Sequence, residues 1–523
     1  MQYGFVKTAA LTPSIRVADC AYNARQIIEV LRGAAAAGAE IACLPELCIT
    51  GYTCGDLFFQ PMLQQGARDA LADVLRDTAG LPLLFVLGLP LTHGGKLYNC
   101  AAVCQNGRVL GVVPKTHLPN YNEFYEKRQF TPAPAENGVI DLSGAQVPFG
   151  TNLLFQCGTQ PALTLAVEIC EDLWAPLPPS TRHAMAGATL ICNLSASDET
   201  IGKAEYRRAL VTGQSARLLC GYVYADAGEG ESTTDMVFAG HNMVAENGAL
   251  LAETAPFCGG MALTDIDVER LAGERLKNTS FPAEDNANYE VIPFVLPQNV
   301  SPLTRIVSSA PFVPADAEQR ARRCDAILAM QASGLKKRLE HTHAKTAVVG
   351  ISGGLDSCLA LLVTVRAFSL LERPLSDIVA VTMPCFGTTE RTRTNAQRLC
   401  EALSVTLQHV DITQTVRSNF ADIGQDEARH DVTYENTQAR VRTLVLMNLA
   451  NRLGGLVIGT GDLSELALGW ATYNGDHMSM YGVNASVPKT LIRHIVASVA
   501  DETESSALRQ VLRDILDTPV SPE

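Results

Sequence analysis

The chain has 523 residues, of which 47% are hydrophobic and 18% charged, and 41 basic against 55 acidic residues give a formal net charge of −14. This length and composition predict two to four folded domains and exclude an intrinsically disordered chain. The acidic balance disfavours a nucleic-acid-binding protein, because neutralising phosphates needs a basic face.

Short apolar runs alternate with longer helical patterns through the first half of the chain. The apolar runs predict strands at 5–10, 40–44, 83–88, 101–105, 109–114, 162–168, 189–194 and 221–225. Helical periodicity predicts helices at 21–37, 61–77 and 203–219. Asn106-Gly107 and Asn247-Gly248 each lie between apolar runs, which is typical of two-residue hairpin turns. We therefore expect an α/β domain here.

Three residues with complementary chemistry each follow an apolar run in this half: Glu46, Lys115 and Cys170. Side chains at strand ends are positioned by the sheet and exposed at its edge. A cysteine thiolate can attack an amide carbonyl, while a carboxylate takes the thiol proton and an ammonium stabilises the oxyanion. A single Cys or Glu is more often a core or surface residue, but the three together predict amide-cleaving chemistry.

A proline-rich region interrupts the regular patterns near residue 300. Five prolines fall within it, which disfavours both a helix and an inner strand: Pro293, Pro297, Pro302, Pro311 and Pro314. We expect domains at 1–292 and 321–523, joined by a linker at 293–320. Helical periodicity over 315–340 leads into the second domain.

An eight-residue segment follows an apolar run and opens a long apolar-rich segment at 358–371: Gly350, Ile351, Ser352, Gly353, Gly354, Leu355, Asp356 and Ser357. The pattern predicts strand, glycine turn and helix, in which backbone N–H groups converge on a pyrophosphate. No Lys follows the glycines, so this is not a Walker A loop. It resembles the loop of enzymes that split ATP between the α and β phosphates. The alternative is an ordinary glycine turn.

The 15 cysteines show no repeated spacing that is typical of a zinc site or a disulfide framework. A reducing cytoplasm is the expected location. The N-terminus lacks the basic and apolar regions of a secretion signal. The longest uncharged stretch, 78–95, is interrupted by Pro82 and Pro90, so we expect no membrane-spanning segment.

Six motifs together carry a wider resemblance, and they lie at 44–47, 114–119, 122–128, 168–174, 350–357 and 459–470. The first half resembles the nitrilase/amidase superfamily, whose Glu-Lys-Cys triad sits on an α-β-β-α sandwich. The chain from about residue 4 to its end resembles the glutamine-dependent NAD synthetase family. That family fuses such a glutaminase to an ATP-pyrophosphatase domain, so a doubly wound parallel sheet is implied for the second half.

The resemblance implies a role for each matching residue of the first half. Glu46 would be the proton acceptor, Lys115 the oxyanion-stabilising group and Cys170 the nucleophile. The glutamine contacts would be Tyr121, Ser197 and Lys203. As alternatives, Ser197 is a helix N-cap for the segment from 203, and Tyr121 a packed ring. Glu126 is either a group that orients the triad or a surface acid.

For the second half, the resemblance implies that residues 350–357, Thr460 and Lys489 bind ATP. Asp356 and Glu465 would ligate Mg²⁺, which prefers carboxylate oxygens. The implied deamido-NAD contacts are Asn436, Glu465, Trp470, Ala471, Thr472 and Tyr473. As alternatives, Trp470 is a core aromatic residue and Lys489 an ordinary surface lysine at a helix start.

The implied enzyme releases ammonia from glutamine, adenylates deamido-NAD with Mg-ATP and amidates it to NAD, giving AMP, pyrophosphate and glutamate. The family continues beyond the 517–522 motif with basic residues that close over the dinucleotide, whereas this sequence ends at Glu523. We therefore expect a synthetase domain truncated at its C-terminus. A homo-oligomer is expected, because symmetric self-association is common.

Two other classes of protein remain open. The first is another amidotransferase of the ATP-pyrophosphatase type, which forms GMP or asparagine. Such enzymes usually carry other glutaminase folds, so the order Glu46, Lys115 and Cys170 argues against them. The second is a non-catalytic assembly or binding protein that has kept the fold.

Overall fold

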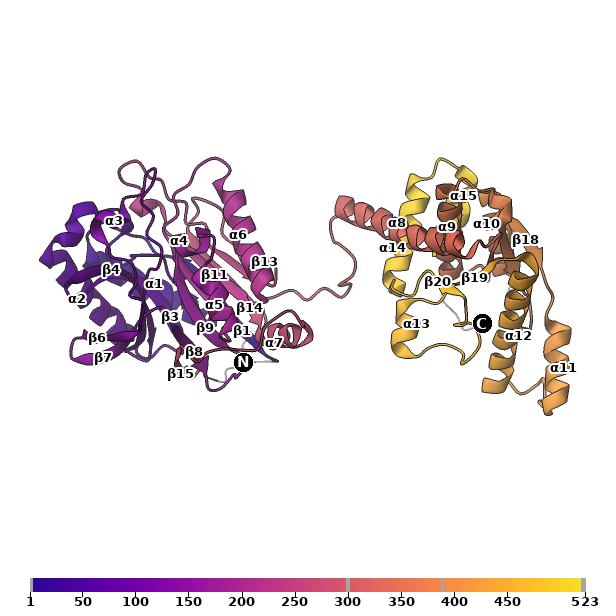
Figure 1. Ribbon diagram of the computed structural model, residues 1–523, viewed down its shortest axis with the longest axis horizontal. Coiled ribbons are helices and arrows are strands. Elements are labelled where there is room, and N and C mark those ends of the chain that lie inside the picture. The colour runs from indigo at the N-terminus through magenta and orange to yellow at the C-terminus, as the bar shows by residue number, and fades with distance from the viewer. Residues whose placement is uncertain (1–2, 298–301, 387–389, 519–523) are drawn as a thin grey trace. The chain divides into compact units, whose positions relative to one another are not determined.

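The computed structural model describes residues 3–297, 302–386 and 390–518, and the chain forms two compact units, Met1–Ile306 and Val307–Glu523 (Figure 1). This division falls inside the predicted linker, whose bounds stay a prediction. Regular structure occupies both ends of that range. Strand β15 (Glu290–Phe294) includes Pro293 at the edge of a sheet, where a missing N–H is tolerated. Helix α8 (Ala317–Thr342) confirms the helical periodicity predicted from residue 315.

The first unit contains two mixed β-sheets. The first sheet has the order β14-β1-β2-β3-β4-β5-β7-β6 and consists of β1 (Phe5–Thr12), β2 (Ile41–Cys43), β3 (Leu84–His93), β4 (Lys96–Gln105), β5 (Arg108–Pro114), β6 (Gly138–Leu142), β7 (Ala145–Phe149) and β14 (Gly260–Asp267). The second has the order β13-β12-β11-β10-β9-β8-β15 and adds β8 (Leu153–Cys157), β9 (Thr164–Ile169), β10 (Leu190–Ser195), β11 (Gly221–Asp226), β12 (Met243–Glu246) and β13 (Ala249–Glu253).

Helices cover the outer faces of these two sheets, and an apolar layer lies between them. Helices α1 (Cys20–Ala36) and α2 (Pro61–Thr78) pack on the first sheet, and α5 (Pro179–Met185) and α6 (Lys203–Leu218) pack on the second. Strand alternation explains the layers: on β10, Ile191 packs in the layer beneath α5 and α6, while its neighbours pack between the sheets. The predicted α-β-β-α sandwich is thereby confirmed.

The predicted local elements of this unit are confirmed, with bounds shifted by a few residues. Asn106 and Asn247 have φ of 50° and 44°, as expected for the tight turns that join β4 to β5 and β12 to β13. Four shorter helices were not predicted: α3 (Glu126–Gln129), α4 (Glu171–Trp174), α5 and α7 (Val268–Lys277).

The second unit is a doubly wound parallel sheet, as predicted. Its strand order is β18-β17-β16-β19-β20, with β16 (Ala347–Gly350), β17 (Ile378–Thr382), β18 (Thr406–His409), β19 (Leu456–Gly459) and β20 (Tyr481–Gly482). One face is covered by α8, α9 (Leu355–Leu370), α10 (Glu390–Leu403), α14 (Lys489–Glu502) and α15 (Ser506–Leu516). The other is covered by α11 (Thr413–Ile423) and α12 (Val432–Leu453), and α13 (Leu463–Leu468) follows β19.

The order of these strands creates a switch point beside β16. The chain runs outward from β16 through β17 to β18, and it then returns to β19 on the other side of β16. The loops after β16 and β19 therefore leave neighbouring strands in opposite directions, and such a place is where open α/β sheets bind ligands. The loop at 351–354 and the loop at 460–462 flank this point.

The described helices include none that is both long and apolar enough to cross a membrane. All 15 cysteines lie within the described ranges, and none of them forms a disulfide.

A close approach of two backbones at Gly88 fixes the turn after β2. A Cβ atom on Gly88 would lie 2.2 Å from the amide nitrogen of Leu47 and 2.7 Å from the carbonyl oxygen of Pro45. Because backbone cannot rotate away as a side chain does, we predict that Gly88→Ala lowers the free energy of unfolding by about 2 kcal/mol or more. Chemical denaturation measures this loss.

The matched control is Gly33→Ala in the last turn of α1, where an added Cβ meets no atom within 4 Å. This change should leave stability unchanged or raise it by up to about 1 kcal/mol, because alanine favours a helix. Equal stabilities of the two variants would contradict the proposed backbone contact.

Candidate active sites

A buried ion cluster lies in the first unit at the ends of β2 and β5. Lys115 Nζ lies 2.6 Å from Oε1 of Glu46 and 2.6 Å from Oε1 of Glu126, and all three side chains are buried. Asn99 on β4 donates to Glu46 Oε1 at 2.6 Å, and the Ala196 amide after β10 donates to Glu46 Oε2 at 3.1 Å. Contacts from both sheets therefore fix the Glu46 carboxylate.

Two carboxylates and one ammonium leave this cluster with an excess of negative charge. Burial raises the pKa of Glu126 to about 7; the Lys115 charge opposes this rise and the Glu46 charge adds to it. Burial by itself lowers the pKa of Lys115, but Glu126 and Glu46 outweigh that effect and raise it well above the ordinary range. Lys115 is therefore an ammonium. The alternative of Glu126 as a surface acid is wrong.

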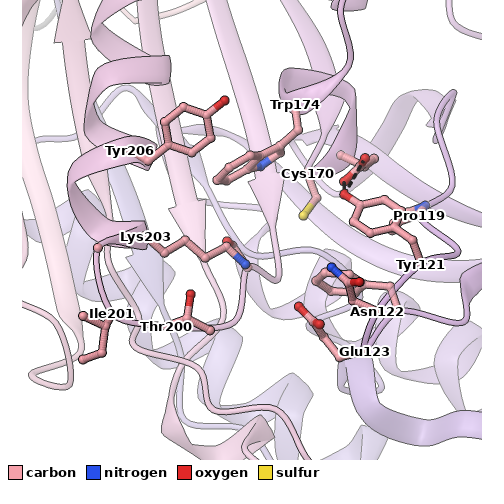
Figure 2. A pocket seen from close by; sticks show the side chains of 14 residues that line it. Pro119, Tyr121, Asn122, Glu123, Cys170, Trp174, Thr200, Ile201, Lys203 and Tyr206 are labelled. Carbon is pink, nitrogen blue, oxygen red and sulfur yellow. Dashed lines mark hydrogen bonds between the residues drawn. The ribbon is translucent and has the colours of Figure 1, made fainter.

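Cys170 follows β9 in a sharp turn that presents its sulfur to a pocket (Figure 2). Its backbone has φ of 45° and ψ of −99°, a conformation that non-glycine residues rarely adopt. Burial raises the pKa of the thiol well above its usual value; Glu46 raises it further, and Lys115 lowers it. The resting thiol is therefore protonated, and it needs a base to act as a nucleophile.

Asp172 joins the cysteine turn to the turn that carries Lys115. Its Oδ2 accepts from the Ile169 amide at 3.0 Å, and its Oδ1 accepts from the His117 amide at 2.8 Å. Burial raises the pKa of Asp172 to about 8. Sequence reasoning gave Asp172 no role, because its partner His117 is distant along the chain.

A cavity of about 400 Å³ opens in front of Cys170 (Figure 2). Its wall combines aromatic, acidic and basic side chains, and it includes Tyr121, Glu123, Phe124, Glu171, Trp174, Ser197, Lys203 and Tyr206. All three residues expected to contact glutamine thus line one cavity together with Cys170.

The contacts of Tyr121 and Ser197 exclude the alternatives of a packed ring and a helix N-cap. The Tyr121 hydroxyl donates to Glu171 Oε1 at 2.9 Å, and the Tyr121 ring is half exposed rather than packed in the core. The Lys203 ammonium pairs with Asp198. Ser197 is not the N-cap of α6, because Gly202 occupies that position without a side-chain cap.

The glycine loop of the second unit joins β16 to α9, as predicted. Gly353 has φ of 82°, and Gly354 is the N-cap of α9. The Ser352 hydroxyl oxygen accepts from the Gly354 amide at 3.2 Å. The first turn of α9 therefore begins directly after the glycines, with its backbone N–H groups free of helical partners.

Asn484 holds the two loops at the switch point together. Its Nδ2 donates to the carbonyl oxygens of Asp356 and Thr460, both at 3.0 Å, and its side chain is fully buried. The predicted ATP residue Thr460 thus lies beside the start of α9. Asn484 carries no motif signal, so sequence reasoning missed it.

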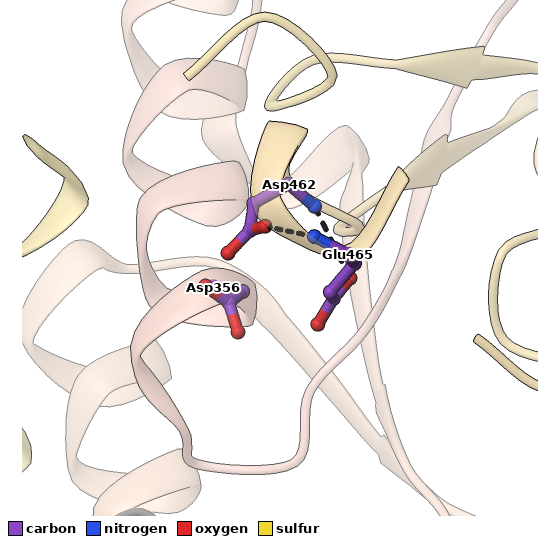
Figure 3. Close-up of side chains that lie close together, drawn as sticks. All are labelled: Asp356, Asp462 and Glu465. Carbon is purple, nitrogen blue, oxygen red and sulfur yellow. Dashed lines mark hydrogen bonds between the residues drawn. The ribbon is translucent and has the colours of Figure 1, made fainter. Parts of the chain in front are cut away.

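Three carboxylates meet at this switch point (Figure 3). One oxygen each of Asp356, Asp462 and Glu465 lies within 4.8 Å of the others. Within the described ranges, Asp356 Oδ1 and Asp462 Oδ2 are buried and accept no hydrogen bond. Oxygen ligands with unused lone pairs fit Mg²⁺. The two predicted ligands are therefore together, and Asp462, to which the sequence analysis assigned no role, lies with them while it also caps α13.

Lys489 lies at the first position of α14 and contacts this cluster. Its ammonium pairs with Asp356 and lies 3.5 Å from Asp462 Oδ2 and 4.0 Å from Glu465 Oε1. Burial lowers the pKa of Lys489, but the neighbouring carboxylates raise it further than burial lowers it. The alternative of an ordinary surface lysine is wrong.

The expected dinucleotide contacts lie along α12 and the segment after α13. Trp470 is 78% exposed and Tyr473 is 74% exposed, so the alternative of a core Trp470 is wrong. Arg440 on α12 donates from Nε to the Tyr473 carbonyl oxygen at 3.2 Å. Arg440 lies one turn after Asn436, so this contact brings the 470–473 segment close to the side of α12 that carries Asn436.

Two family comparisons divide the chain in the same way as the two sites. Residues 7–275 match the carbon-nitrogen hydrolase family, and residues 327–501 match the NAD synthase family. The chain thus combines a carbon-nitrogen hydrolase domain with an NAD synthase domain.

Comparison with known proteins identifies the family within this class of two-domain enzymes. The chain is 46% identical over 540 residues to a glutamine-dependent NAD(+) synthetase of Mycobacterium tuberculosis, with coverage of 100% of this chain and 79% of that protein. It is 43% identical over 538 residues to the Mycobacterium leprae synthetase, with coverage of 99% and 79%. The chain belongs to the glutamine-dependent NAD(+) synthetase family and is a ligase of NAD biosynthesis.

Proposed function

We propose that Cys170, Glu46 and Lys115 hydrolyse glutamine, and that the second unit uses ATP and Mg²⁺ to convert deamido-NAD into NAD with the released ammonia. The observation that carries this proposal is the buried ammonium of Lys115, 2.6 Å from Glu46, beside a cavity that Cys170 lines.

The cavity suits a free amino acid with an amide side chain. The carboxylate of such a zwitterion needs a positively charged partner, and its ammonium needs a negatively charged one. Lys203 supplies positive charge in the wall, and Glu123 and Glu171 supply negative charge. The rings of Phe124 and Trp174 each lie 5.6 Å from the Lys203 ammonium and give the methylene groups of glutamine an apolar contact.

The first half-reaction follows from the protonated thiol. Cys170 Sγ attacks the amide carbon as its proton moves to Glu46, and the carbonyl electron pair moves onto oxygen beside the Lys115 ammonium. Collapse of this intermediate breaks the carbon–nitrogen bond, and the leaving nitrogen takes the proton from Glu46 to become ammonia. Water activated by Glu46 then cleaves the thioester and releases glutamate.

The second half-reaction occurs at the switch point. A carboxylate oxygen of deamido-NAD attacks the α-phosphorus of ATP and pyrophosphate leaves; ammonia then attacks the acyl carbon and AMP leaves. Residues 350–357, Thr460 and Lys489 hold the phosphates. Asp356, Asp462 and Glu465 would hold Mg²⁺, which when bound neutralises negative charge on the phosphates. Asn436, Glu465, Trp470, Ala471, Thr472 and Tyr473 contact deamido-NAD.

The proposal also places this enzyme in a reducing cytoplasm as a homo-oligomer. The location is supported by 15 cysteines that form no disulfide within the described ranges. Self-association is supported only by its general frequency among enzymes.

Because the proposed glutaminase and synthetase sites are separate, we predict that Cys170→Ala abolishes synthesis with glutamine and leaves synthesis with ammonium intact. Glutamate release should fall by about 10³-fold or more, because no other nucleophile replaces the thiol. Mass spectrometry of products from deamido-NAD, Mg-ATP and ammonium should show the same NAD and AMP as the unchanged enzyme. Equal loss with both nitrogen sources would contradict separate sites.

For Asp356→Asn in the carboxylate cluster we predict the reverse pattern, in which the synthetase site is impaired and the glutaminase site is not. Loss of one charged oxygen ligand should weaken Mg-ATP binding by about tenfold or more, while glutamate release persists. Isothermal calorimetry and a glutamate assay measure the two effects. Asp325→Asn on α8, whose carboxylate forms an exposed ion pair, is the control. Unimpaired Mg-ATP binding would remove Asp356 from the metal site.

The pKa of about 7 at Glu126 predicts an acid limb in the pH profile of glutamate release. Above this pKa the carboxylate holds the Lys115 ammonium, and as pH falls through about 7 the group gains a proton and loses that charge. The ratio kcat/KM should therefore decrease on the acid side. Glu126→Gln should have a low kcat/KM that no longer changes across this range. An unchanged acid limb in this variant would assign the limb to another group.

A further inference from the structure

Arg207 is a fully buried arginine that contacts Ser197, a residue of the wall of the glutaminase cavity. It lies on α6 one turn after Lys203, so both side chains extend from the same side of that helix. A buried guanidinium is costly unless its donors are paired. The partners of Arg207 therefore indicate what the residue does.

The guanidinium binds three consecutive residues of the segment after β10. Nη2 donates to Ser197 Oγ at 3.2 Å and to the Asp198 carbonyl oxygen at 3.3 Å. Nη1 donates to Glu199 Oε2 at 3.0 Å. One rigid group thus sets the position of the whole 197–199 segment.

A second layer of contacts holds the guanidinium itself. Nη1 of Arg207 lies 3.1 Å from His241 Nδ1, and His241 Nε2 lies 3.2 Å from Glu253 Oε2. Because arginine can only donate, Nδ1 is the acceptor and the ring hydrogen resides on Nε2, directed at Glu253. Burial lowers the pKa of His241, which agrees with a neutral ring.

These contacts dictate the orientation of two cavity groups. Arg207 occupies a lone pair of Ser197 Oγ and cannot accept the hydroxyl hydrogen, which within the described chain donates to no acceptor. That hydrogen is available to a ligand, because Ser197 lines the cavity. The Asp198 backbone is fixed by the same guanidinium, and the Asp198 carboxylate pairs with the Lys203 ammonium.

We propose that Arg207 is a positioning residue for substrate recognition, which presents the Ser197 hydroxyl and the Lys203 ammonium as a donor pair for the carboxylate of the amino acid. Arg207 acts only through Ser197 and Asp198 and does not touch the substrate. This inference rests on the proposed binding of glutamine in this cavity. It assigns to Arg207 the affinity for glutamine and not the reactivity of Cys170.

The test is Arg207→Lys in the full chain, with initial rates of glutamate release at varied glutamine. Lysine keeps the charge but lacks the planar fork, so it cannot hold Ser197, Asp198 and Glu199 together. KM for glutamine should rise about tenfold or more, while kcat changes less than about threefold. The rate at which iodoacetamide alkylates Cys170 without glutamine should stay unchanged. Arg217→Lys, an exposed arginine on the same helix, should match the unchanged enzyme.

A double-mutant cycle separates positioning from general stability. If Arg207 acts through Ser197, then Arg207→Lys should raise KM much less in a Ser197→Ala background than alone. Full additivity, or a loss of kcat at unchanged KM, would overturn the proposal. Should Arg207→Lys fail to fold, Glu199→Gln keeps the guanidinium and loosens its Nη1 contact, and it should raise KM by about twofold to fivefold. An unchanged KM there would also overturn the proposal.

Measurements on the enzyme without substitutions show whether the role of Arg207 or the proposed function itself has failed. Glutamate release, and protection of Cys170 from iodoacetamide by glutamine, test the proposed function directly. Absence of both would reject the glutaminase assignment. Their presence, with an unaltered KM in Arg207→Lys, would reject only the role of Arg207.

Discussion

The ammonium of Lys115 lies in the interior of the first unit, 2.6 Å from each of two carboxylates. Taking these charges out of water is unfavourable, and only close pairing offsets the cost. The pairing requires the ends of β2 and β5 and the short helix α3 to stay fixed relative to one another. The backbone contact at Gly88 fixes the end of β2, because β3 leaves no space beside the turn at 45–47. The reactive thiol then needs only to be placed at the end of β9.

A lysine among carboxylates occurs in both units, but with a different consequence. Lys115 is fully buried, and two carboxylates bind it at hydrogen-bonding distance. Lys489 is a third exposed and lies beside three carboxylates, two of which carry a buried oxygen that accepts no hydrogen bond within the described ranges. The first arrangement uses two of the three hydrogens of the ammonium, so under the proposed function the third would be left for the oxyanion. The second has unused oxygen lone pairs, so it has capacity for a cation and for phosphates.

The sequence analysis identified site residues that stand out from their neighbours, such as a charged or reactive residue directly after an apolar run. Glu46, Lys115 and Cys170 each follow an apolar run, and the glycine loop has a recognisable pattern, so their strand-end positions followed from strand geometry. Arg207 and Asp172 gave no such signal, because each acts through partners that only the fold brings near. Asp462 lies within the 459–470 motif, but the motif did not single it out; the structure shows that it caps α13 and also contributes to the acidic cluster.

The two sites depend on each other through the protonation state of nitrogen. Ammonium has no lone pair, so only neutral ammonia attacks an adenylated carboxylate. In the proposed half-reaction the nitrogen leaves with the proton that Glu46 would take from the thiol, which would make the product ammonia rather than an amide anion. In the proposed function the cavity, with Ser197 and Lys203 positioned by Arg207, would select the amide, and the residues at the switch point would select the acid that is activated. A fused chain thus links a specific nitrogen source to a specific acceptor.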